Sequence, residues 1–149
     1  MKRTFGLVFF GVALAATVVT AADAPQDIVD QRVAAMKQMG GKVNEAFQLS
    51  GTDATASRAK LAEAIALAEA IPSRFPAGTA DGDPGVKTRA LPKIWSDSAG
   101  FKTAADGLVS ALKAVDAKLA AKDPAVEAAF NDARKACGTC HETYRGPNK

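Results

Sequence analysis

Residues 135–145 read KACGTCHETYR and contain both cysteines and the only histidine of the 149-residue chain. Residues 137–141 match the C-x-x-C-H pattern of covalent c-type haem attachment. On a helix, thiols three residues apart and an imidazole four residues after the first thiol project from one face. Cys137 and Cys140 can then form thioethers with one porphyrin while His141 reaches the iron. The stretch therefore predicts a helix that carries one haem c, with His141 as an axial ligand.

Other uses of these side chains fit the chain less well. A structural zinc site needs four Cys or His ligands, and the chain has only three such residues. A thioredoxin-like redox pair follows a strand, whereas residues 125–136 continue one helical pattern. A peroxidase would need a distal histidine, and His141 is the only histidine, so we expect a protein that is not an enzyme. A disulfide or a redox thiol pair is the alternative left open.

The N-terminus is typical of an export signal. Lys2 and Arg3 precede an apolar run over residues 5–19, and small residues follow at Ala21 and Ala22. A membrane anchor is the alternative, but about 15 apolar residues are short for a span of ~20. We therefore expect residues 1–22 to be a cleaved signal peptide. Residues 23–149 would then form one periplasmic haem domain that is not inserted in the membrane.

Charge argues against a nucleic-acid partner. The chain has 19 basic and 16 acidic residues, and loss of Lys2 and Arg3 leaves 17 against 16. Two haem propionates would turn this small excess negative. No run of Lys and Arg with interleaved aromatic residues is present. The expected partners are therefore periplasmic redox proteins.

Four segments have apolar residues at helical spacing, and no sustained alternation indicates a strand. They run over residues 26–49, from an N-cap at Thr52 or Asp53 to Ile71, from a start between Pro92 and Ser98 to Leu119, and from Asp123-Pro124 to Tyr144. Four such helices joined mostly by short turns predict an all-α, antiparallel four-helix bundle. The haem motif lies on the last of them.

The first segment has one apolar stripe of residues spaced three or four apart, namely Val29, Val33, Met36, Gly40, Val43 and Phe47. Gly40 and its neighbour Gly41 each cost about 1 kcal/mol in a helix interior relative to Ala. We therefore expect the haem or a partner helix to lie close to the backbone at these glycines.

The connection over residues 71–92 is rich in Pro and Gly and too long for an ordinary turn in a compact bundle. Its apolar Phe75, with the nearby Ile94 and Trp95, could fold over an exposed haem edge. A solvent-exposed mobile loop is the alternative.

Taken together, these features resemble the class II c-type cytochromes, which include cytochrome c′. The resemblance covers nearly all of the chain after the signal segment, and its motifs are residues 135–145, PKIW at 92–95 and RVAAMK at 32–37. It implies a four-helix haem protein in which His141 is the proximal ligand. It also implies that Arg145 lies beside the proximal pocket and that Met36 is the distal residue facing the iron.

The role of Met36 decides between two possible functions, electron transfer and gas binding. By periodicity alone Met36 could be core filler, but thioether sulfur is also a good axial ligand for haem iron. Within the resembling family, some members bind methionine and are low-spin electron carriers, and others are five-coordinate and bind nitric oxide or carbon monoxide. We expect Met36 to be a ligand and the protein to transfer one electron at a time. Gas binding is the alternative, and Met39 is a weaker candidate ligand.

Two further points stay open. Arg32, one turn before Met36, could contact a haem propionate or could be a solvated charge at the flank of the helix. The oligomeric state, a homodimer included, does not follow from the sequence.

Overall fold

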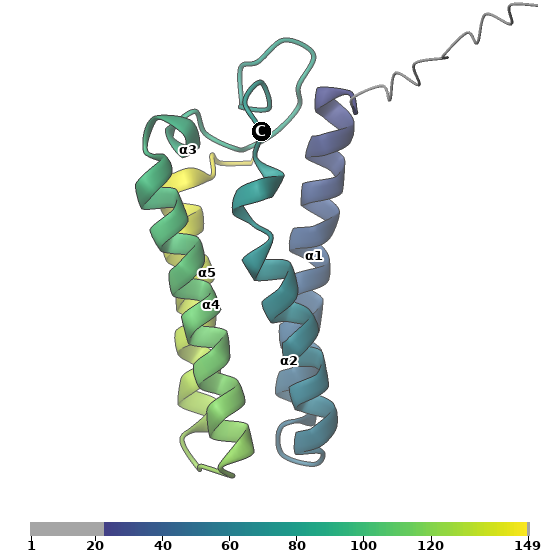
Figure 1. The fold of residues 1–149 in the computed structure, drawn as a ribbon, viewed down its shortest axis with the longest axis vertical. Helices are drawn as coiled ribbons and strands as arrows, with labels where there is room; N and C mark the ends of the chain where they lie inside the picture. Colours follow the sequence, from purple (N-terminus) through teal and green to yellow (C-terminus); the bar gives the residue numbers. More distant parts are fainter. Residues whose placement is uncertain (1–22, 149) are drawn as a thin grey trace, which may run out of the picture.

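The computed structural model describes residues 23–148, which form an up-down-up-down bundle of long helices (Figure 1). These helices are α1 (Pro25–Leu49), α2 (Ala54–Glu69), α4 (Ser98–Ala120) and α5 (Val126–Tyr144), with a short 3-10 helix η1 (Pro72–Arg74) and a single turn α3 (Lys93–Ser96) between α2 and α4. Within this part of the chain the only β-type pairing is an isolated bridge between Ala90 and Arg145. The predicted all-α antiparallel bundle is therefore confirmed.

The predicted signal peptide, residues 1–22, lies outside the described residues. Among residues 23–148, no helix combines the length and the apolar character that crossing a bilayer requires.

Local capping explains several helix boundaries. The Asp53 side chain accepts a hydrogen bond of 2.9 Å from the backbone N–H of Ala56, so one of the two predicted N-caps of α2 is confirmed. The third predicted helix is divided into α3 and α4 at Asp97, whose side chain caps α4 by accepting from Gly100 N.

The predicted start of the last helix at Asp123-Pro124 is wrong by two residues, because α5 begins at Val126. The Asp123 carboxylate accepts from the N–H of Ala125 at 2.8 Å and from Lys118 Nζ at 2.6 Å. These contacts hold residues 123–125 in a separate turn before the helix, so Asp123 caps a turn instead of α5.

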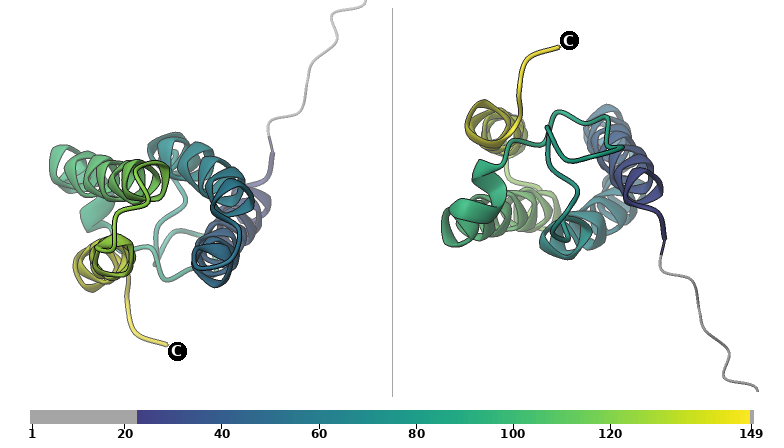
Figure 2. Two further views of the ribbon diagram at one scale, coloured as in Figure 1. Left: turned by 90° about the horizontal axis from the view of Figure 1, so that it is seen from below. Right: turned by 90° about the horizontal axis from the view of Figure 1, so that it is seen from above.

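The helices pack in the order α1 on α2, α2 on α4 and α4 on α5. Viewed along the bundle axis they stand at the corners of a square, and part of the 75–92 connection lies inside its upper end (Figure 2). Small residues allow close packing of α1 on α2. Ser57 is fully buried, and its hydroxyl donates a hydrogen bond of 2.7 Å to the carbonyl of Ala46. α1 and α5, which carry the predicted ligands, stand on either side of the remaining edge of the square and are less closely packed than the other neighbouring helices.

The buried face of α1 differs from the predicted stripe. Its buried residues are Val29, Arg32, Ala35, Met39, Val43 and Ala46. Val33, placed in the stripe, is 42% exposed, while Met36 and Phe47 are partly buried. The difference arises because α1 buries its face mainly against α2, whereas the predicted stripe is rotated toward α5.

The glycines of α1 are not explained by a neighbouring helix. A Cβ built at Gly40 or Gly41 meets no heavy atom within 4 Å apart from the flanking backbone. The expectation that a partner helix approaches this backbone is therefore wrong within the described chain, and the haem remains the expected neighbour.

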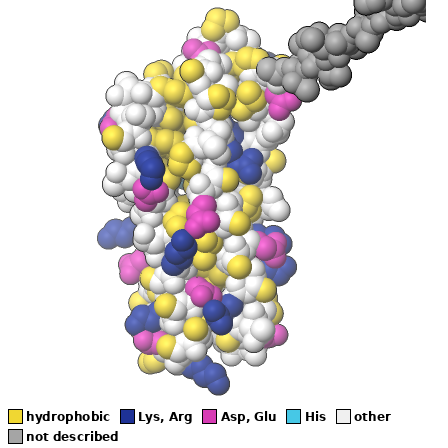
Figure 3. Space-filling view, viewed as in Figure 1, with side chains coloured by type: hydrophobic (Ala, Val, Ile, Leu, Met, Phe, Trp, Pro, Cys, Tyr) yellow, Lys and Arg dark blue, Asp and Glu magenta, His cyan; other side chains and the backbone are white. Residues whose placement is uncertain are grey.

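Several charged side chains on the outside of the bundle form ion pairs between helices. Lys42 and Glu63 join α1 to α2 at 2.8 Å, and Lys113 and Glu69 join α2 to α4 at 2.7 Å. In the space-filling view, basic and acidic groups accordingly lie side by side over α2 and α4 (Figure 3). Such exposed pairs contribute little stability individually.

Candidate functional site

The cysteines of the C-x-x-C-H motif lie on one face of α5, in its last turns. Cys137 and Cys140 are free thiols, each half-buried against the hydrophobic core. Burial raises the pKa of both thiols, and the charge of Cys137 contributes to the rise at Cys140. Both sulfurs are therefore protonated thiols at neutral pH and form no disulfide in this structure.

His141 extends the same face by one turn. Its side chain is exposed and has no hydrogen bond with any described residue. Partial burial lowers the pKa of the imidazole, and the positive charges of Arg145 and Arg89 lower it further. The ring is therefore neutral at pH 7, which is the form that binds a metal.

A ring contact sets the register between α1 and α5. The Phe47 and Phe130 rings meet edge to face with centroids 5.3 Å apart, and the Arg134 guanidinium lies 4.2 Å from the Phe47 centroid. Phe130 is fully buried, so this contact closes the core between the two helices. It is a fixed reference point for comparing heights on the two helices.

Met36 lies at the height of His141. Met36 is eleven residues before Phe47 on α1, and His141 is eleven residues after Phe130 on the antiparallel α5. Eleven residues make about three helical turns, or roughly 16 Å, so each residue repeats the direction of its phenylalanine. By the same argument Gly40 lies at the height of Cys137. The face of α1 that carries Met36 is therefore directed toward the motif.

The other methionine of α1 has a different setting. Met39 is 7% exposed and belongs to the hydrophobic core, whereas Met36 is partly buried and packs at the edge of that core. Eight residues separate Met39 from Phe47, which turns Met39 about 80° away from the face directed at α5. Met36 is thus the methionine that the fold places opposite His141.

Arg32 is buried and bonded to the long connection. Its guanidinium donates to Thr79 Oγ1 and Thr79 O at 2.7 Å and to Thr88 Oγ1 at 2.8 Å, and its carbon Cζ lies 4.6 Å from the Phe75 centroid. Arg32 is 3% exposed, so the interpretation of a solvated flank charge is wrong. The reason is that residues 75–92 fold back over α1 and supply neutral acceptors.

Aromatic rings link this connection to α5. Trp95 Nε1 donates a hydrogen bond of 3.1 Å to the carbonyl of Phe75. The ring centroids of Phe75 and Phe101 are 4.9 Å apart, and those of Phe101 and Tyr144 are 5.3 Å apart. Ile94 is buried in the same core. The connection is therefore anchored at the motif end of the bundle, and the alternative of a loose solvent loop does not hold.

Sequence reasoning missed two groups of residues at this end. Arg89 adds a second positive charge near His141 and donates from Nε to the carbonyl of Gly146 at 2.7 Å. Thr79 and Thr88 fill the hydrogen-bonding capacity of Arg32. No spacing rule could have found these contacts, because they join residues 47 to 57 positions apart.

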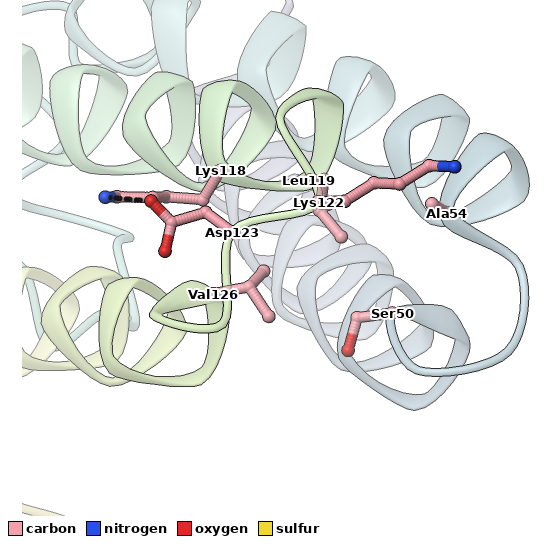
Figure 4. Close-up of a pocket in the computed structure, with 7 residues that line it drawn as sticks. All are labelled: Ser50, Ala54, Lys118, Leu119, Lys122, Asp123 and Val126. Atoms are coloured by element: carbon pink, nitrogen blue, oxygen red, sulfur yellow. Dashed lines mark hydrogen bonds and ion pairs between the residues drawn. The ribbon is translucent and has the colours of Figure 1, made fainter.

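A hollow at the opposite end of the bundle is unrelated to the motif. It is lined by Ser50, Ala54, Lys118, Leu119, Lys122, Asp123 and Val126, where the connections α1–α2 and α4–α5 come together (Figure 4). Its Lys118 and Asp123 are already paired. The two cysteines and the histidine of the motif are at the other end.

The residues at the motif end fit a covalently held haem. Two thiols and a neutral imidazole lie on one helix face, and by helix geometry Met36 is on the side of α1 toward α5. Within residues 23–148 no group of three or more His, Cys, Asp and Glu could hold a metal ion without such a cofactor. The donor set thus suits iron carried by a porphyrin, with thioether links and axial N and S ligands.

Comparisons with known proteins agree with this site. Residues 27–145 match the family model described as Cytochrome C'. Cytochrome c-556 of Agrobacterium fabrum is 32% identical, over 97% of this chain and 95% of the relative. The crystal structure of cytochrome c' from Rubrivivax gelatinosus has a TM-score of 0.68 at 28% identity, over 81% of this chain and 96% of that one.

A further solved relative is a nitric oxide complex of a mutant of cytochrome c prime from Alcaligenes xylosoxidans. It has a TM-score of 0.72 at 25% identity, over 86% of this chain and 100% of that chain. Family match, relatives and bundle architecture lead to one conclusion. The chain belongs to the cytochrome c′ family, whose members carry one covalently attached haem c.

Proposed function

We propose that this protein is a periplasmic one-electron carrier whose haem iron is bound by His141 on one side and Met36 on the other. In this proposal residues 1–22 are an export signal cleaved after Ala21 or Ala22. Cys137 and Cys140 form the two thioether links. The haem supplies the redox couple, and the chain supplies ligands, burial and charge.

The common height of Met36 and His141 carries the proposal. Axial ligands must face each other across the porphyrin, and the Phe47–Phe130 contact supports such an arrangement, because both residues are eleven positions from a ring of this pair. The unbranched thioether of Met36 has the reach and the flexibility to meet an iron from a helix that is not in tight contact with α5.

The surrounding charges favour the roles assigned to the chain's own residues. Burial lowers the pKa of His141, and the charges of Arg145 and Arg89 lower it further, so the neutral imidazole that serves as a ligand is favoured. Positive charge near the proximal side also favours the reduced state of a bound redox centre, which raises its potential. Arg145 thus lies beside the proximal pocket in this proposal, and Arg32 is assigned to a propionate through the N–H groups that its threonine partners leave free.

Gas binding is the second candidate, and a solved relative favours it. If Met36 did not bind the iron, a five-coordinate haem would accept nitric oxide or carbon monoxide. The nitric oxide complex of the Alcaligenes xylosoxidans relative shows this chemistry for that protein.

Absorption spectra of the ferric and ferrous holoprotein test the choice. We expect a low-spin ferric spectrum with the near-infrared band of methionine-to-iron charge transfer, and little carbon monoxide binding. Met36→Leu should convert the protein to high spin and open it to carbon monoxide, while Met39→Leu, the matched control, should not. A wild-type protein that is already high-spin and binds carbon monoxide would overturn electron transfer in favour of gas binding.

A further inference from the structure

Residues 79–91 join the first and last helices at the motif end of the bundle. α1 and α5 pack on each other less closely than the other neighbouring helices do. The ring contact between Phe47 and Phe130 lies toward the opposite end of both helices. Within the polypeptide, the spacing of α1 and α5 at the height of Met36 and His141 therefore depends on other contacts.

Hydrogen bonds hold this segment on the α1 side. Arg32 donates to Thr79 Oγ1 and Thr79 O at 2.7 Å and to Thr88 Oγ1 at 2.8 Å. Nearer the start of α1, the side-chain oxygen Oε1 of Gln26 accepts from the N–H of Lys87 at 2.7 Å. Arg32 is buried, so water competes little for its three bonds. The segment is thus tied to the first half of α1.

On the α5 side the same segment pairs with the chain that leaves the motif helix. The N–H of Leu91 donates to the carbonyl of Tyr144 at 3.0 Å, and the N–H of Gly146 donates to the carbonyl of Arg89 at 2.7 Å. Arg89 Nε donates in turn to the carbonyl of Gly146 at 2.7 Å. These reciprocal bonds lie on both sides of the isolated bridge described above and join the segment to the end of α5.

The two predicted ligands lie between the ring contact and this segment. Arg32 is four residues before Met36, about 6 Å along α1, and Tyr144 is three residues after His141, about 4.5 Å along α5. Viewed along the bundle axis, the connection passes between the two helices (Figure 2). It therefore spans from α1 to α5 within about one helical turn of both ligands, and its hold affects the gap that Met36 has to bridge.

We propose that residues 79–91 form a positioning strap, which sets the spacing of α1 and α5 and thereby the fraction of molecules in which Met36 binds the iron. This inference rests on the proposed ligation by Met36. Thr88 and Gly146 are positioning residues in it, since they act through the strap and not on the iron. An intact strap favours the low-spin electron carrier. A loosened strap shifts the equilibrium toward the five-coordinate form that accepts gas, because the ligated form loses the free energy of the strap contacts.

Matched substitutions test the strap at each end. Thr88→Val removes the hydroxyl that accepts from Arg32 and from the N–H of Ala90, and Thr88→Ser keeps it. Gly146→Pro removes the N–H that donates to Arg89, and Gly146→Ala keeps it with a Cβ no closer than 3.4 Å to a neighbour. In the Val and Pro variants we expect the high-spin fraction of the ferric holoprotein and its carbon monoxide affinity to rise by up to about tenfold. The Ser and Ala variants should match the wild type.

A control separates the strap from destabilisation alone. Ser57→Ala loses a buried hydrogen bond between α1 and α2 and leaves the strap contacts in place. Its spectrum should therefore match that of the wild type, even where its unfolding midpoint falls as far as that of Thr88→Val.

The spacing itself can be measured without reference to the iron ligands. In the holoprotein the motif cysteines are held in thioethers, so spin labels react only with cysteines introduced at the exposed positions Gln38→Cys on α1 and Lys135→Cys on α5. Pulsed dipolar electron paramagnetic resonance then gives the distance between the two labels. Thr88→Val should broaden the distance distribution, and Thr88→Ser should not.

Two results would overturn the strap. One is a distance distribution that is unchanged in both Thr88→Val and Gly146→Pro. The other is a spectral change in Ser57→Ala as large as theirs. A wild-type protein that is already high-spin would overturn ligation by Met36 and, with it, the effect of the strap on spin state. The label distances distinguish this case, because they report the spacing whichever ligand the iron has.

Discussion

The hydroxyl of Tyr144 donates a hydrogen bond of 2.8 Å to Asp97, so the end of the motif helix is tied to the start of α4. Asp97 uses its other carboxylate oxygen to cap α4 at Gly100 N, 3.2 Å away. One carboxylate thus stabilises a helix start and positions the turn that follows Cys140 and His141. The chain packs closely around this carboxylate.

Gly100 is the first test of that packing. A Cβ at Gly100 would lie 2.5 and 2.6 Å from the Asp97 oxygens and 2.6 Å from the Tyr144 hydroxyl. Gly100→Ala should therefore lower the free energy of unfolding by about 1–3 kcal/mol, as overpacking does. Gly107→Ala on the same helix meets nothing within 4 Å and should raise it by up to about 1 kcal/mol. Denaturant melts measure both, and equal effects would contradict the packing around Asp97.

Tyr144 gives a pH test, because it is the only tyrosine. Burial raises its pKa, and the hydrogen bond to Asp97 and the negative charge of that carboxylate raise it further. The folded state thus favours the neutral phenol. This contribution to stability is complete below the ordinary tyrosine pKa of about 10 and is lost as pH rises through the folded pKa.

Spectrophotometric titration of the phenolate reads Tyr144 alone. Asp97→Asn should bring its pKa down toward the ordinary value while leaving it somewhat raised by burial. An Asp97→Asn titration that coincides with the wild type would show that the hydrogen bond has no influence on Tyr144.

The contact between Phe47 and Phe130 predicts a link between stability and spin state. Phe47→Ala should cost about 3 kcal/mol through the lost ring packing. It should also increase the high-spin fraction, since the register that places Met36 opposite His141 loosens. Arg134→Gln removes the exposed cation–π contact, worth about 0.5–1 kcal/mol, together with an exposed hydrogen bond to Asn131, and it should leave the spin state unchanged. A destabilised Phe47→Ala protein with an unaltered spectrum would argue against that register.

Removal of the Arg32 side chain should release the long connection. Arg32→Met loses three hydrogen bonds from a charged donor, to the hydroxyl and carbonyl oxygens of Thr79 and to the hydroxyl of Thr88, a loss of at least about 3 kcal/mol. Thr88→Val removes the bond from Arg32 and the bond that Thr88 Oγ1 accepts from the N–H of Ala90, and it should cost less than Arg32→Met. Trypsin reports the release by cutting after Lys87 or Arg89. Equal resistance of Arg32→Met and wild type to trypsin would show that the connection is held elsewhere.

Local signals in the sequence predicted most of the fold. The Asp53 cap and the apolar spacing of α4 are properties of neighbouring residues, and the structure confirms them. The predicted end of the second helix at Ile71 is wrong by two residues, because α2 ends at Glu69 and a 3-10 helix begins at Pro72. The predicted apolar stripe of α1 is rotated about the helix axis relative to the face that the structure buries. Periodicity shows that a stripe exists, but the choice between the Met39 and Met36 sides depends on where α2 and α5 stand.

The site could be predicted only in its local part. The C-x-x-C-H spacing is contained in five residues, so its helical face followed directly. The partners of Arg32 and the second charge near His141 come from residues 79–89, which are far from both residues in the sequence. Residue spacing carries no information on contacts of this kind. The ligand roles of Met36 and His141 stay predictions until the spectra are measured.

The placement of the two axial candidates on the first and last helices has a consequence for the order of maturation. Thioether formation at Cys137 and Cys140 needs only a short, accessible segment, so it can precede folding. Coordination by Met36 needs α1 and α5 to be assembled, which requires almost the whole chain. A newly exported polypeptide would show the absorption of covalently bound haem first and a low-spin spectrum last. The delay between the two would measure the folding time of the bundle.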